Sequence, residues 1–328
     1  MRVMILSNEM FDVIKSDLEL LEKKLLEAVD SSVAVVEEIG THLVTAGGKR
    51  LRPALFLLAA HGGKDFSLEK AMPLAVSLEL IHTASLVHDD VIDEAALRRG
   101  KPTANAKWGN QVSVLSGDYV FARAFQLVAA GDYGAEVCTR MAELVCNLST
   151  GEIIQDSKEY QASLDMEDYY DRIKKKTADF LEVCSELGAR IGGMPQEDVV
   201  RMAEFGHAIG MAFQITDDLL DIEQDTEKTG KPAGNDIRQG IVTLPVMKAL
   251  KESPDCAELE AIVTNPDMTE DMVRRALEIV KESDGVAFAM RKADEYLEQA
   301  RLALPASLPM EIRDAFLQVV DFIGERDF

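Results

Sequence analysis

The sequence has few cysteines, only 4 in 328 residues. Cys138, Cys146, Cys184 and Cys256 form no Cys-x-x-Cys pair and no other spacing typical of metal ligands. This pattern argues against a cysteine-ligated metal centre. We interpret the four residues as buried thiols of a protein from a reducing compartment.

Positive charge is also scarce. The chain carries 35 Lys and Arg against 58 Asp and Glu, a formal net charge of −23 at pH 7. Such a charge disfavours nucleic acid as a partner. An acidic protein that handles phosphate groups needs a metal ion and a local patch of Lys and Arg, so we searched the sequence for both.

Long hydrophobic runs are missing as well. The start of the chain is too short in its apolar part to form a signal peptide. No run approaches the roughly 20 apolar residues of a membrane span. We therefore expect a soluble, cytoplasmic protein with no transmembrane segment.

Apolar residues recur at helical spacing along most of the chain, and no stretch shows the alternation of a strand. This pattern predicts an all-α fold, a large helical bundle formed by one domain over residues 1–328. The helices that we expect cover residues 11–29, 31–45, 68–93, 113–130, 136–159, 166–188 and 197–221.

The predicted helix over residues 68–93 ends in three carboxylates, Asp89, Asp90 and Asp93. On a helix, Asp89 and Asp93 share a face and lie about 6 Å apart along the axis. Two carboxylates at that separation repel each other, which argues for a bound divalent cation. Oxygen ligands without Cys or His favour Mg²⁺ over zinc.

The same Asp-Asp-x-x-Asp motif occurs again as Asp217, Asp218 and Asp221, once more closing an apolar helical run. Two copies of this motif are hard to explain as surface decoration. We predict that the two motifs lie on facing helices of the bundle and together form a metal site.

Basic residues lie near the first motif. Lys49, Arg50 and Arg52 precede an apolar helix with Pro53 in its first turn, which places positive charge at a helix N-terminus. Arg98 and Arg99 follow the motif, and an arginine fork matches phosphate oxygens. These residues suit an anion such as a diphosphate.

Three other features bear on the site, and the first two have two readings each. His82 is two turns before Asp89 on the same face, so it is either a satisfied core residue or a diphosphate contact. Lys176 and Thr177 belong to a lysine run that either faces solvent or directs one ammonium and one hydroxyl inward. The stretch 223–236, rich in Gly, Pro and charge, has the composition of a mobile lid.

Together these parts predict a chemistry. Opposed carboxylates, Mg²⁺ and a ring of Lys and Arg form a clamp for a diphosphate, whose developing charge the clamp neutralises. The helix behind the first motif is apolar, so the organic part of the substrate should be apolar too. Metal-assisted loss of diphosphate from such a substrate yields a carbocation.

The sequence resembles the trans-type polyprenyl diphosphate synthases, and the resemblance runs in order from about residue 41 to residue 245. The matching segments are Gly48-Lys49-Arg50-Leu51-Arg52-Pro53, His82, both aspartate motifs, Arg98-Arg99-Gly100, Gly117-Asp118-Tyr119, Lys176-Thr177, Phe213-Gln214 and Gly230-Lys231. The resemblance implies the isoprenoid synthase fold and condensation of isopentenyl diphosphate with an allylic diphosphate, either farnesyl or geranylgeranyl diphosphate.

The resemblance also implies a role for each matching residue. Asp89, Asp93 and Asp217 would be the main ligands of about three Mg²⁺ ions, supported by Asp90, Asp218 and Asp221. Lys49, Arg52, His82 and Arg99 would hold the diphosphate of isopentenyl diphosphate. Arg98, Lys176 and Lys231 would hold the allylic diphosphate, and Thr177 and Gln214 would lie near the allylic cation.

One position departs from the family pattern. Many members have a lysine four residues before the proline that matches Pro245, whereas this chain has Ile241. The allylic site therefore lacks one expected cation. A similar substitution occurs in some larger subunits of hexa- and heptaprenyl synthases, so a homodimer and a heterodimer with a small subunit both stay open.

Chain length is set in this family four or five positions before the first aspartate. The residues there are Ser85 and Ala84, both small, with Ile81 one turn deeper. We expect a pocket that admits products of about thirty to forty carbons. In the alternative, Phe121 or Phe125 closes the pocket and the product is geranylgeranyl diphosphate.

Other functions compete with this interpretation. A terpene cyclase or head-to-head synthase shares the fold type but lacks the paired basic sites. A non-catalytic subunit need not keep Lys176, Thr177 and Gln214, and a calcium-binding helical protein would need a different loop. By family analogy alone, the product would become the side chain of a respiratory quinone.

Overall fold

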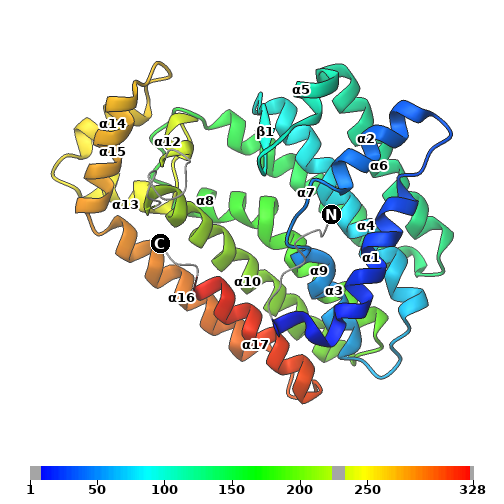
Figure 1. Ribbon diagram of the computed structural model, residues 1–328. Coiled ribbons are helices and arrows are strands. Elements are labelled where there is room, and N and C mark those ends of the chain that lie inside the picture. The colour runs from blue at the N-terminus through cyan, green and yellow to red at the C-terminus, as the bar shows by residue number, and fades with distance from the viewer. Residues whose placement is uncertain (1–8, 224–232, 326–328) are drawn as a thin grey trace. The chain divides into compact units, whose positions relative to one another are not determined.

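The structure is a computed structural model that describes residues 9–223 and 233–325. Nearly all regular structure in these residues is helical (Figure 1), which confirms the predicted all-α class. The elements are η1 (Glu9–Ile14), α1 (Lys15–Ala28), α2 (Ala34–Val44), α3 (Leu51–His61), α4 (Leu68–Ile92), β1 (Leu97–Arg98), β2 (Lys101–Pro102), α5 (Ala104–Trp108), α6 (Asn110–Ala130), α7 (Gly134–Ser157), α8 (Met166–Ile173), η2 (Lys174–Ala178), α9 (Asp179–Ile191), α10 (Gln196–Glu223), α12 (Asn235–Arg238), α13 (Leu244–Glu252), α14 (Cys256–Val263), α15 (Glu270–Glu282), α16 (Gly285–Ala303) and α17 (Met310–Gly324).

Two features differ from the sequence expectation. The helix expected over residues 166–188 is interrupted, because residues Lys174–Ala178 form a π-helical segment between α8 and α9. A short antiparallel hairpin, β1–β2, follows α4, although no strand was expected. Both differences fall on residues that the sequence analysis assigned to the site.

The chain divides into two compact units. Among the described residues, unit 1 holds those up to Val145 together with Val183–Ala203 and Pro305–Phe316. Unit 2 holds Cys146–Glu182, Glu204–Leu304 and the residues from Leu317 onward. Four of the five boundaries fall inside helices, namely α7, α9, α10 and α17, and the fifth falls between α16 and α17. The single domain over residues 1–328 stays a prediction.

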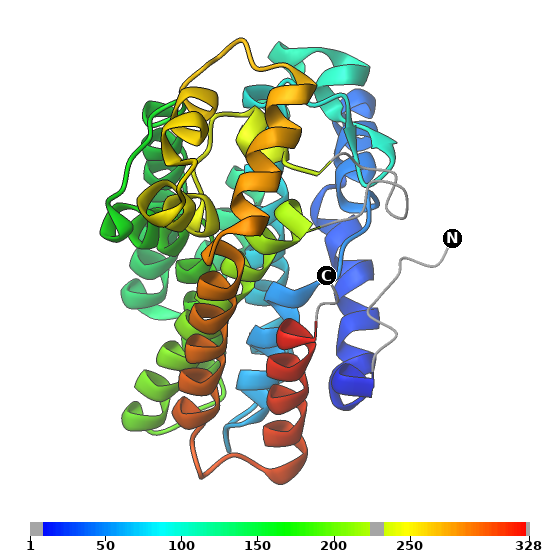
Figure 2. The same ribbon diagram turned by 90° about the vertical axis from the view of Figure 1, so that its left-hand side faces the viewer.

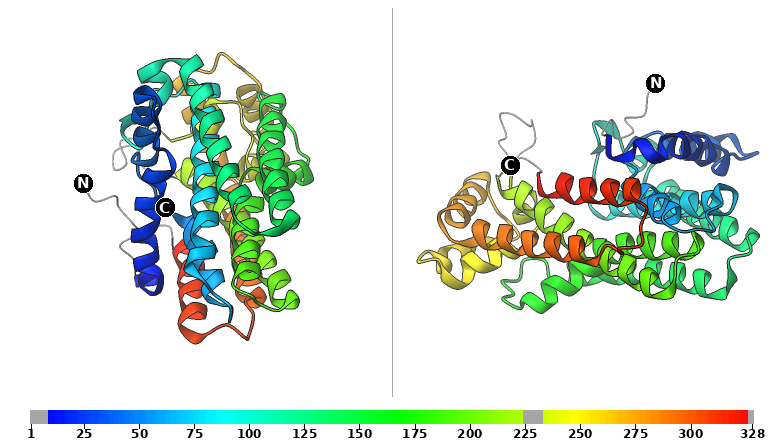
Figure 3. Two further views of the ribbon diagram at one scale, coloured as in Figure 1. Left: turned by 90° about the vertical axis from the view of Figure 1, so that its right-hand side faces the viewer. Right: turned by 90° about the horizontal axis from the view of Figure 1, so that it is seen from below.

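In unit 1, α4 is the central helix. It contacts α1, α2, α3 and α6, and it runs beside α6 (Figure 3). Close packing needs Gly117 on α6, because a Cβ at this position would lie 2.2 Å from Nε2 of His88. The packing of α4 against α6 thus fixes the turn of α4 that carries the first aspartate motif.

The length and composition of α4 correct one expectation. This helix is long and apolar enough to cross a membrane, contrary to the prediction that no run approaches a span. However, 72% of its most apolar window is buried within the structure. A mostly buried helix of this kind is typical of a protein core.

In unit 2, α13 packs against α14 and α16, and α15 packs against α14 and α16 (Figure 2). Their apolar faces form a core with residues of α10, including Ile215, Leu219 and Ile222. These three residues are fully buried; Ile215 and Ile222 flank the second aspartate motif, and Leu219 lies within it. Burial of the opposite face of α10 therefore sets the direction in which the motif points.

Candidate active site

The first aspartate motif lies at the C-terminal end of α4. Asp89 is partly exposed and Asp93 is exposed, whereas Asp90 is buried. The Oδ1 atom of Asp90 accepts a hydrogen bond of 2.7 Å from Nε of Arg98. Burial raises the pKa of Asp90, and this bond opposes the shift. The exposed first and third aspartates are thus the ones that are placed to reach a ligand.

The hairpin β1–β2 presents the two arginines. Its turn residues Arg99 and Gly100 both have positive φ, 53° and 74°, as a type I′ turn requires. Glycine adopts this conformation readily, whereas arginine rarely does. The turn brings Arg99 against Gly48, where a Cβ would lie 2.5 Å from Nη1 of Arg99. The hairpin and the glycine loop are therefore fitted to each other at this arginine.

Arg52, His82 and Arg99 form a cationic cluster in unit 1, in which Arg52 and His82 are partly buried and Arg99 is exposed. Nη1 of Arg52 lies 3.3 Å from Nε2 of His82. Burial, followed by the charge of Arg99, lowers the pKa of Arg52. Burial and then the charges of Arg52 and Arg99 hold the pKa of His82 well below its usual value. A bound anion would relieve this repulsion, so the cluster has the electrostatic character of a diphosphate site.

Arg50 has a different role from its basic neighbours. Its guanidinium donates to Glu22 at 2.5 Å and 3.1 Å, to Glu79 at 2.7 Å and to the carbonyl oxygen of Val44 at 2.7 Å. Burial opposes its charge, but the two glutamates raise its pKa. Arg50 therefore joins α1, α4 and the end of α2, while Lys49 beside it is exposed.

A pocket of about 510 Å³, open to solvent, lies next to the cationic cluster within unit 1. His82, Arg98 and Arg99 line it together with apolar residues such as Leu86 and Val87. Three of the five predicted substrate-binding residues of this unit thus share one concave surface, and Lys49 and Arg52 are not among the residues that line it.

The second motif lies near the end of α10 in unit 2. Asp217 is exposed, whereas Asp218 is buried and Asp221 is partly buried. Oδ1 and Oδ2 of Asp221 accept the backbone N–H groups of Asn235 and Asp236 at 3.0 Å and 2.9 Å. Asp221 thereby links the end of α10 to α12 and caps the start of α12.

Asp236 joins this group, although the sequence analysis placed it only in the lid segment. Burial, followed by the charges of Asp218, Asp221 and Asp217, raises the pKa of Asp236 well above its usual value. Burial, and after it the charge of Asp217, also raises the pKa of Asp218 to about 6 and the pKa of Asp221 above its usual value. A group of carboxylates of this character suits a divalent cation, and oxygen donors suit Mg²⁺. No short-range pattern around Asp236 pointed to this role.

The π-helical segment η2 positions Lys176 and Thr177. Nζ of Lys176 lies 2.9 Å from Oε2 of Glu152 and donates to Oε1 of Gln155 at 3.1 Å. The segment is packed closely, because a Cβ at Gly210 of α10 would lie 2.5 Å from Cα of Ala178. Thr177 is buried and Lys176 is partly buried against Glu152 and Gln155, which favours the inward one of the two readings. π-Helical turns also occur frequently at functional sites.

Thr177 begins a chain of hydrogen bonds in unit 2. Its hydroxyl donates to Oε1 of Gln214 at 2.7 Å, and Nε2 of Gln214 donates to Oδ1 of Asp218 at 2.9 Å. The hydroxyl of Tyr169 donates to Oδ2 of Asp218 at 2.8 Å. The structure therefore brings together three predicted site residues and adds Tyr169, which the sequence analysis missed.

The residues predicted to set chain length lie on α4. Ile81 and Ala84 are fully buried, and Ser85 is partly exposed. The hydroxyl of Ser85 donates to the carbonyl oxygen of His82 at 3.0 Å, so its polar atom is satisfied by its own helix. Their role in chain length stays a prediction.

Of two positions in the predicted allylic site, the structure describes Ile241 but not Lys231. Ile241 is 9% exposed, and its N–H donates to the carbonyl oxygen of Asp236 at 2.8 Å. Lys231 and the lid residues 224–232 lie outside the described residues. The interpretation of Lys231 therefore rests on the resemblance alone.

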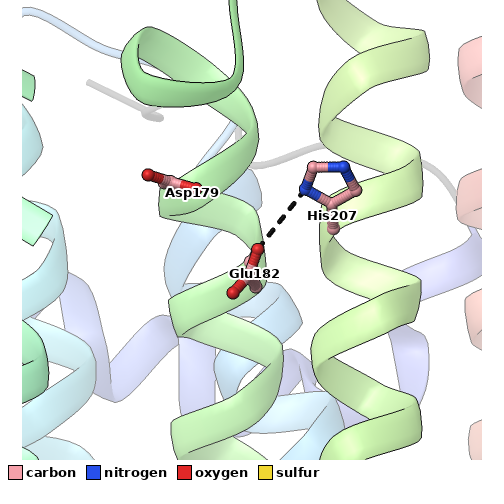
Figure 4. Close-up of side chains that lie close together, drawn as sticks. All are labelled: Asp179, Glu182 and His207. Atoms are coloured by element: carbon pink, nitrogen blue, oxygen red, sulfur yellow. Dashed lines mark ion pairs between the residues drawn. The ribbon is translucent and has the colours of Figure 1, made fainter. Parts of the chain in front are cut away.

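A separate group of titratable residues lies between α9 and α10 in unit 2 (Figure 4). Each of Asp179, Glu182 and His207 has one oxygen or nitrogen atom that could bind a metal ion, and these three atoms lie within 4.8 Å of one another. Nδ1 of His207 is 3.4 Å from Oε2 of Glu182, and Asp179 accepts a hydrogen bond of 2.8 Å from Asn147. An ion pair and a hydrogen bond account for this group, and we assign no metal to it.

Comparison with known proteins decides the family. The family model described as Polyprenyl synthetase matches residues 33–280. The chain belongs to the polyprenyl synthetase family. This membership agrees with the resemblance carried by the aspartate motifs and with the all-α fold described above.

Individual relatives of this family match nearly the whole chain. Heptaprenyl diphosphate synthase component 2 of Geobacillus stearothermophilus is 41% identical over 321 residues, 97% of this chain and 98% of the relative. Nonaprenyl diphosphate synthase of Mycobacterium tuberculosis is 38% identical over 286 residues, 87% of this chain and 85% of the relative. A crystal structure of a polyprenyl synthase from Caulobacter crescentus, complexed with calcium and isoprenyl diphosphate, has a TM-score of 0.88 at 33% identity and covers 97% of both chains.

Proposed function

We propose that the protein is a Mg²⁺-dependent prenyltransferase that condenses isopentenyl diphosphate with an allylic diphosphate to give a long-chain trans-polyprenyl diphosphate. The observation that carries this proposal is the 41% identity, over nearly the full length, to a heptaprenyl diphosphate synthase component. The product would have about thirty to forty carbons, because the small side chains of Ala84 and Ser85 would leave room for a long apolar chain.

The cationic cluster supplies the first binding function. Lys49, Arg52, His82 and Arg99 hold the diphosphate of isopentenyl diphosphate. The support is electrostatic, because burial and the charges of neighbouring arginines lower the pKa of Arg52, His82 and Arg99. A neutral His82 donates or accepts one hydrogen bond without adding to the repulsion.

The allylic diphosphate is held by Arg98, Lys176 and Lys231. Arg98 is oriented by Asp90, and Lys176 is oriented by Glu152 and Gln155. About three Mg²⁺ ions, held mainly by Asp89, Asp93 and Asp217, would neutralise the charge that develops on the departing diphosphate. The exposure of Asp217 and Asp93 and the partial exposure of Asp89 suit this role.

The oxygen atoms of Thr177 and Gln214 lie near the allylic cation and stabilise it as it forms. The double bond of isopentenyl diphosphate then attacks the cation, and the diphosphate that has departed accepts the proton that is lost. Repetition of this cycle extends the chain until the pocket is filled.

A heterodimer is a second candidate state. Two relatives named as component 2 of heptaprenyl diphosphate synthases, at 41% and 36% identity, favour a catalytic large subunit with a small partner. Ile241, in place of the lysine of many members, points the same way. In either state we place the enzyme in the cytoplasm, where it would supply quinone side chains.

Product analysis of the purified chain tests the proposal. The chain alone is incubated with Mg²⁺, farnesyl diphosphate and labelled isopentenyl diphosphate, and an Asp93→Asn variant serves as the control. We expect a ladder that ends near thirty to forty carbons and disappears in the control. A ladder that ends at twenty would contradict the open pocket. An inactive chain that becomes active with a small subunit would establish the heterodimer.

A further inference from the structure

The middle aspartate of the second motif is placed differently from its neighbours. Asp217 is exposed, whereas Asp218 is only 4% exposed. Both oxygens of Asp218 accept hydrogen bonds from protein groups, Oδ1 from Gln214 at 2.9 Å and Oδ2 from Tyr169 at 2.8 Å. A buried carboxylate needs such donors, since an unsatisfied one is costly. Asp218 is thus engaged by the protein on both oxygens.

These bonds determine the orientation of Gln214. An ionised carboxylate only accepts hydrogen bonds, so the amide of Gln214 must turn its NH₂ group toward Asp218. Its carbonyl oxygen Oε1 is then left for Thr177, whose hydroxyl donates to it at 2.7 Å. With its only proton committed, the Thr177 hydroxyl keeps its lone pairs as acceptors. The direction of every bond in the chain follows from the charge on Asp218.

Tyr169 completes this arrangement from α8. The side chain of Tyr169 is 3% exposed. The guanidinium of Arg172 lies over its ring, with Cζ 5.5 Å from the ring centroid. Arg172 is itself buried and donates to the carbonyl oxygen of Val242 at 3.1 Å. The Tyr169 hydroxyl is therefore held rigidly at the carboxylate.

We propose that Tyr169 and Asp218 are positioning residues that fix the amide of Gln214 and, through it, the hydroxyl of Thr177 so that both present oxygen lone pairs to the allylic cation. In this role Asp218 is the hub of a hydrogen-bond relay, and its carboxylate is not required as a metal ligand. The inference rests on the proposed function, because that function places Thr177 and Gln214 at the cation.

The first experiment replaces Tyr169 with phenylalanine and uses Tyr170→Phe as the matched control. Tyr170 is the neighbouring tyrosine, and its ring packs against Tyr296 instead of entering the relay. We expect Tyr169→Phe to lower kcat about 10- to 100-fold, as loss of one charge-assisted hydrogen bond permits, with KM for both substrates within twofold. Tyr170→Phe should retain wild-type kcat. Equal rates for the two variants would overturn the proposal.

Non-additivity separates positioning from a general loss of stability. When residues act as one unit, the first substitution already removes most of their joint effect on kcat. Adding Tyr169→Phe to a Thr177→Val variant should therefore lower kcat by less than about a further twofold. A purely structural role would instead lower kcat by the same factor in both backgrounds, which would contradict the relay.

An exchange of the two hub residues tests the role of the Asp218 carboxylate. Asp218→Asn keeps one acceptor oxygen where the carboxylate has two, so it cannot accept from both Gln214 and Tyr169, and we expect a loss of about 100-fold in kcat. In the double variant Asp218→Asn/Gln214→Glu, the introduced glutamate accepts from Thr177 and from the NH₂ group of the introduced asparagine, while the oxygen of that asparagine accepts from Tyr169. Every donor then has an acceptor, although the bond between positions 214 and 218 is reversed. We expect this double variant to recover at least tenfold of the loss, with the half-saturating Mg²⁺ concentration within twofold of wild type. No recovery together with a raised Mg²⁺ requirement would make Asp218 a metal ligand and overturn the proposal.

The failure of this inference is distinguishable from failure of the proposed function. Wild-type product formation in the same assay tests the function, whereas the variants test only the relay. An active wild type with an unaffected Tyr169→Phe would leave the prenyltransferase in place and remove the positioning role.

Discussion

Arg98 donates from Nε to Oδ1 of Asp90 across 2.7 Å, and Asp90 is 5% exposed. The family resemblance implied different ligands for these two residues, a metal ion for Asp90 and the allylic diphosphate for Arg98. Their direct pairing instead makes Asp90 the residue that orients Arg98. The middle aspartate of each motif is thus buried and bonded to protein groups, within its own unit.

This pairing leads to a prediction for Asp90→Asn. The amide leaves Arg98 less firmly oriented, so KM for the allylic diphosphate should rise about five- to tenfold, equivalent to roughly 1–1.4 kcal/mol. The half-saturating Mg²⁺ concentration should change little. Asp93→Asn serves as the comparison and should raise the Mg²⁺ requirement strongly. Steady-state kinetics with both ligands varied would reject this assignment if the two variants behaved alike.

Product length should respond to the size of residue 85. Ser85 is partly exposed, so a phenylalanine there can extend from α4 without overpacking the core, as it would at the fully buried Ala84. We expect Ser85→Phe to end the product ladder near fifteen to twenty carbons, because the ring narrows the pocket. Ser85→Ala should keep the wild-type ladder. Chromatography of the dephosphorylated products measures both, and an unchanged ladder in Ser85→Phe would place the pocket floor elsewhere.

Stability should depend on pH through His82. Burial and the neighbouring arginines depress its pKa in the folded state, so the unfolded chain binds more protons as the pH falls below about 6.5. The stabilising contribution is present above that pH and is lost as the pH falls toward the folded pKa. In His82→Gln this contribution is absent. Urea unfolding from pH 8 to pH 5 should therefore show a steeper loss of unfolding free energy in the wild type, and parallel curves would refute the prediction.

The prediction of a single domain can be tested by calorimetry. Four helices, α7, α9, α10 and α17, each contribute residues to both compact units. A helix that belongs to two units couples their unfolding, because neither unit can lose it alone. We expect one thermal transition with equal calorimetric and van't Hoff enthalpies. Two resolved transitions would mean that the units unfold as separate domains.

Much of the fold could be predicted from local pattern. The helical spacing of apolar residues located α4 and α10 to within a few residues, and the two aspartate motifs marked their C-terminal ends. The periodicity shows which face of a helix is buried, and burial of that apolar face determines where these helices form. The separation of α8 from α9 was not predicted, because a π-helical turn depends on close packing against residues such as Gly210.

The candidate site was predictable in its residue types and less so in its bonds. Charge and spacing identified Asp218, Gln214 and Thr177. They did not identify Tyr169, which lies 45 positions before Gln214 and has the sequence pattern of an ordinary core aromatic residue. Asp236 was missed for the same reason, since it reaches the motif through the backbone bonds of α12. Contacts between segments distant in sequence leave no periodic signal in either segment.

The π-helical segment has a consequence for how insertions and deletions act at this point. A π-helical turn holds one residue more than the α-helical turn that it replaces. The extra residue lets α8 and α9 each keep its own buried face on either side of the segment. Removal of one lysine from the run 174–176 would leave the residue types around Thr177 unchanged. Each residue of an α-helix turns about 100°, so the ammonium and the hydroxyl would then point in new directions while the flanking helices stayed packed. At this segment the number of residues, rather than their identity, encodes the reactive geometry.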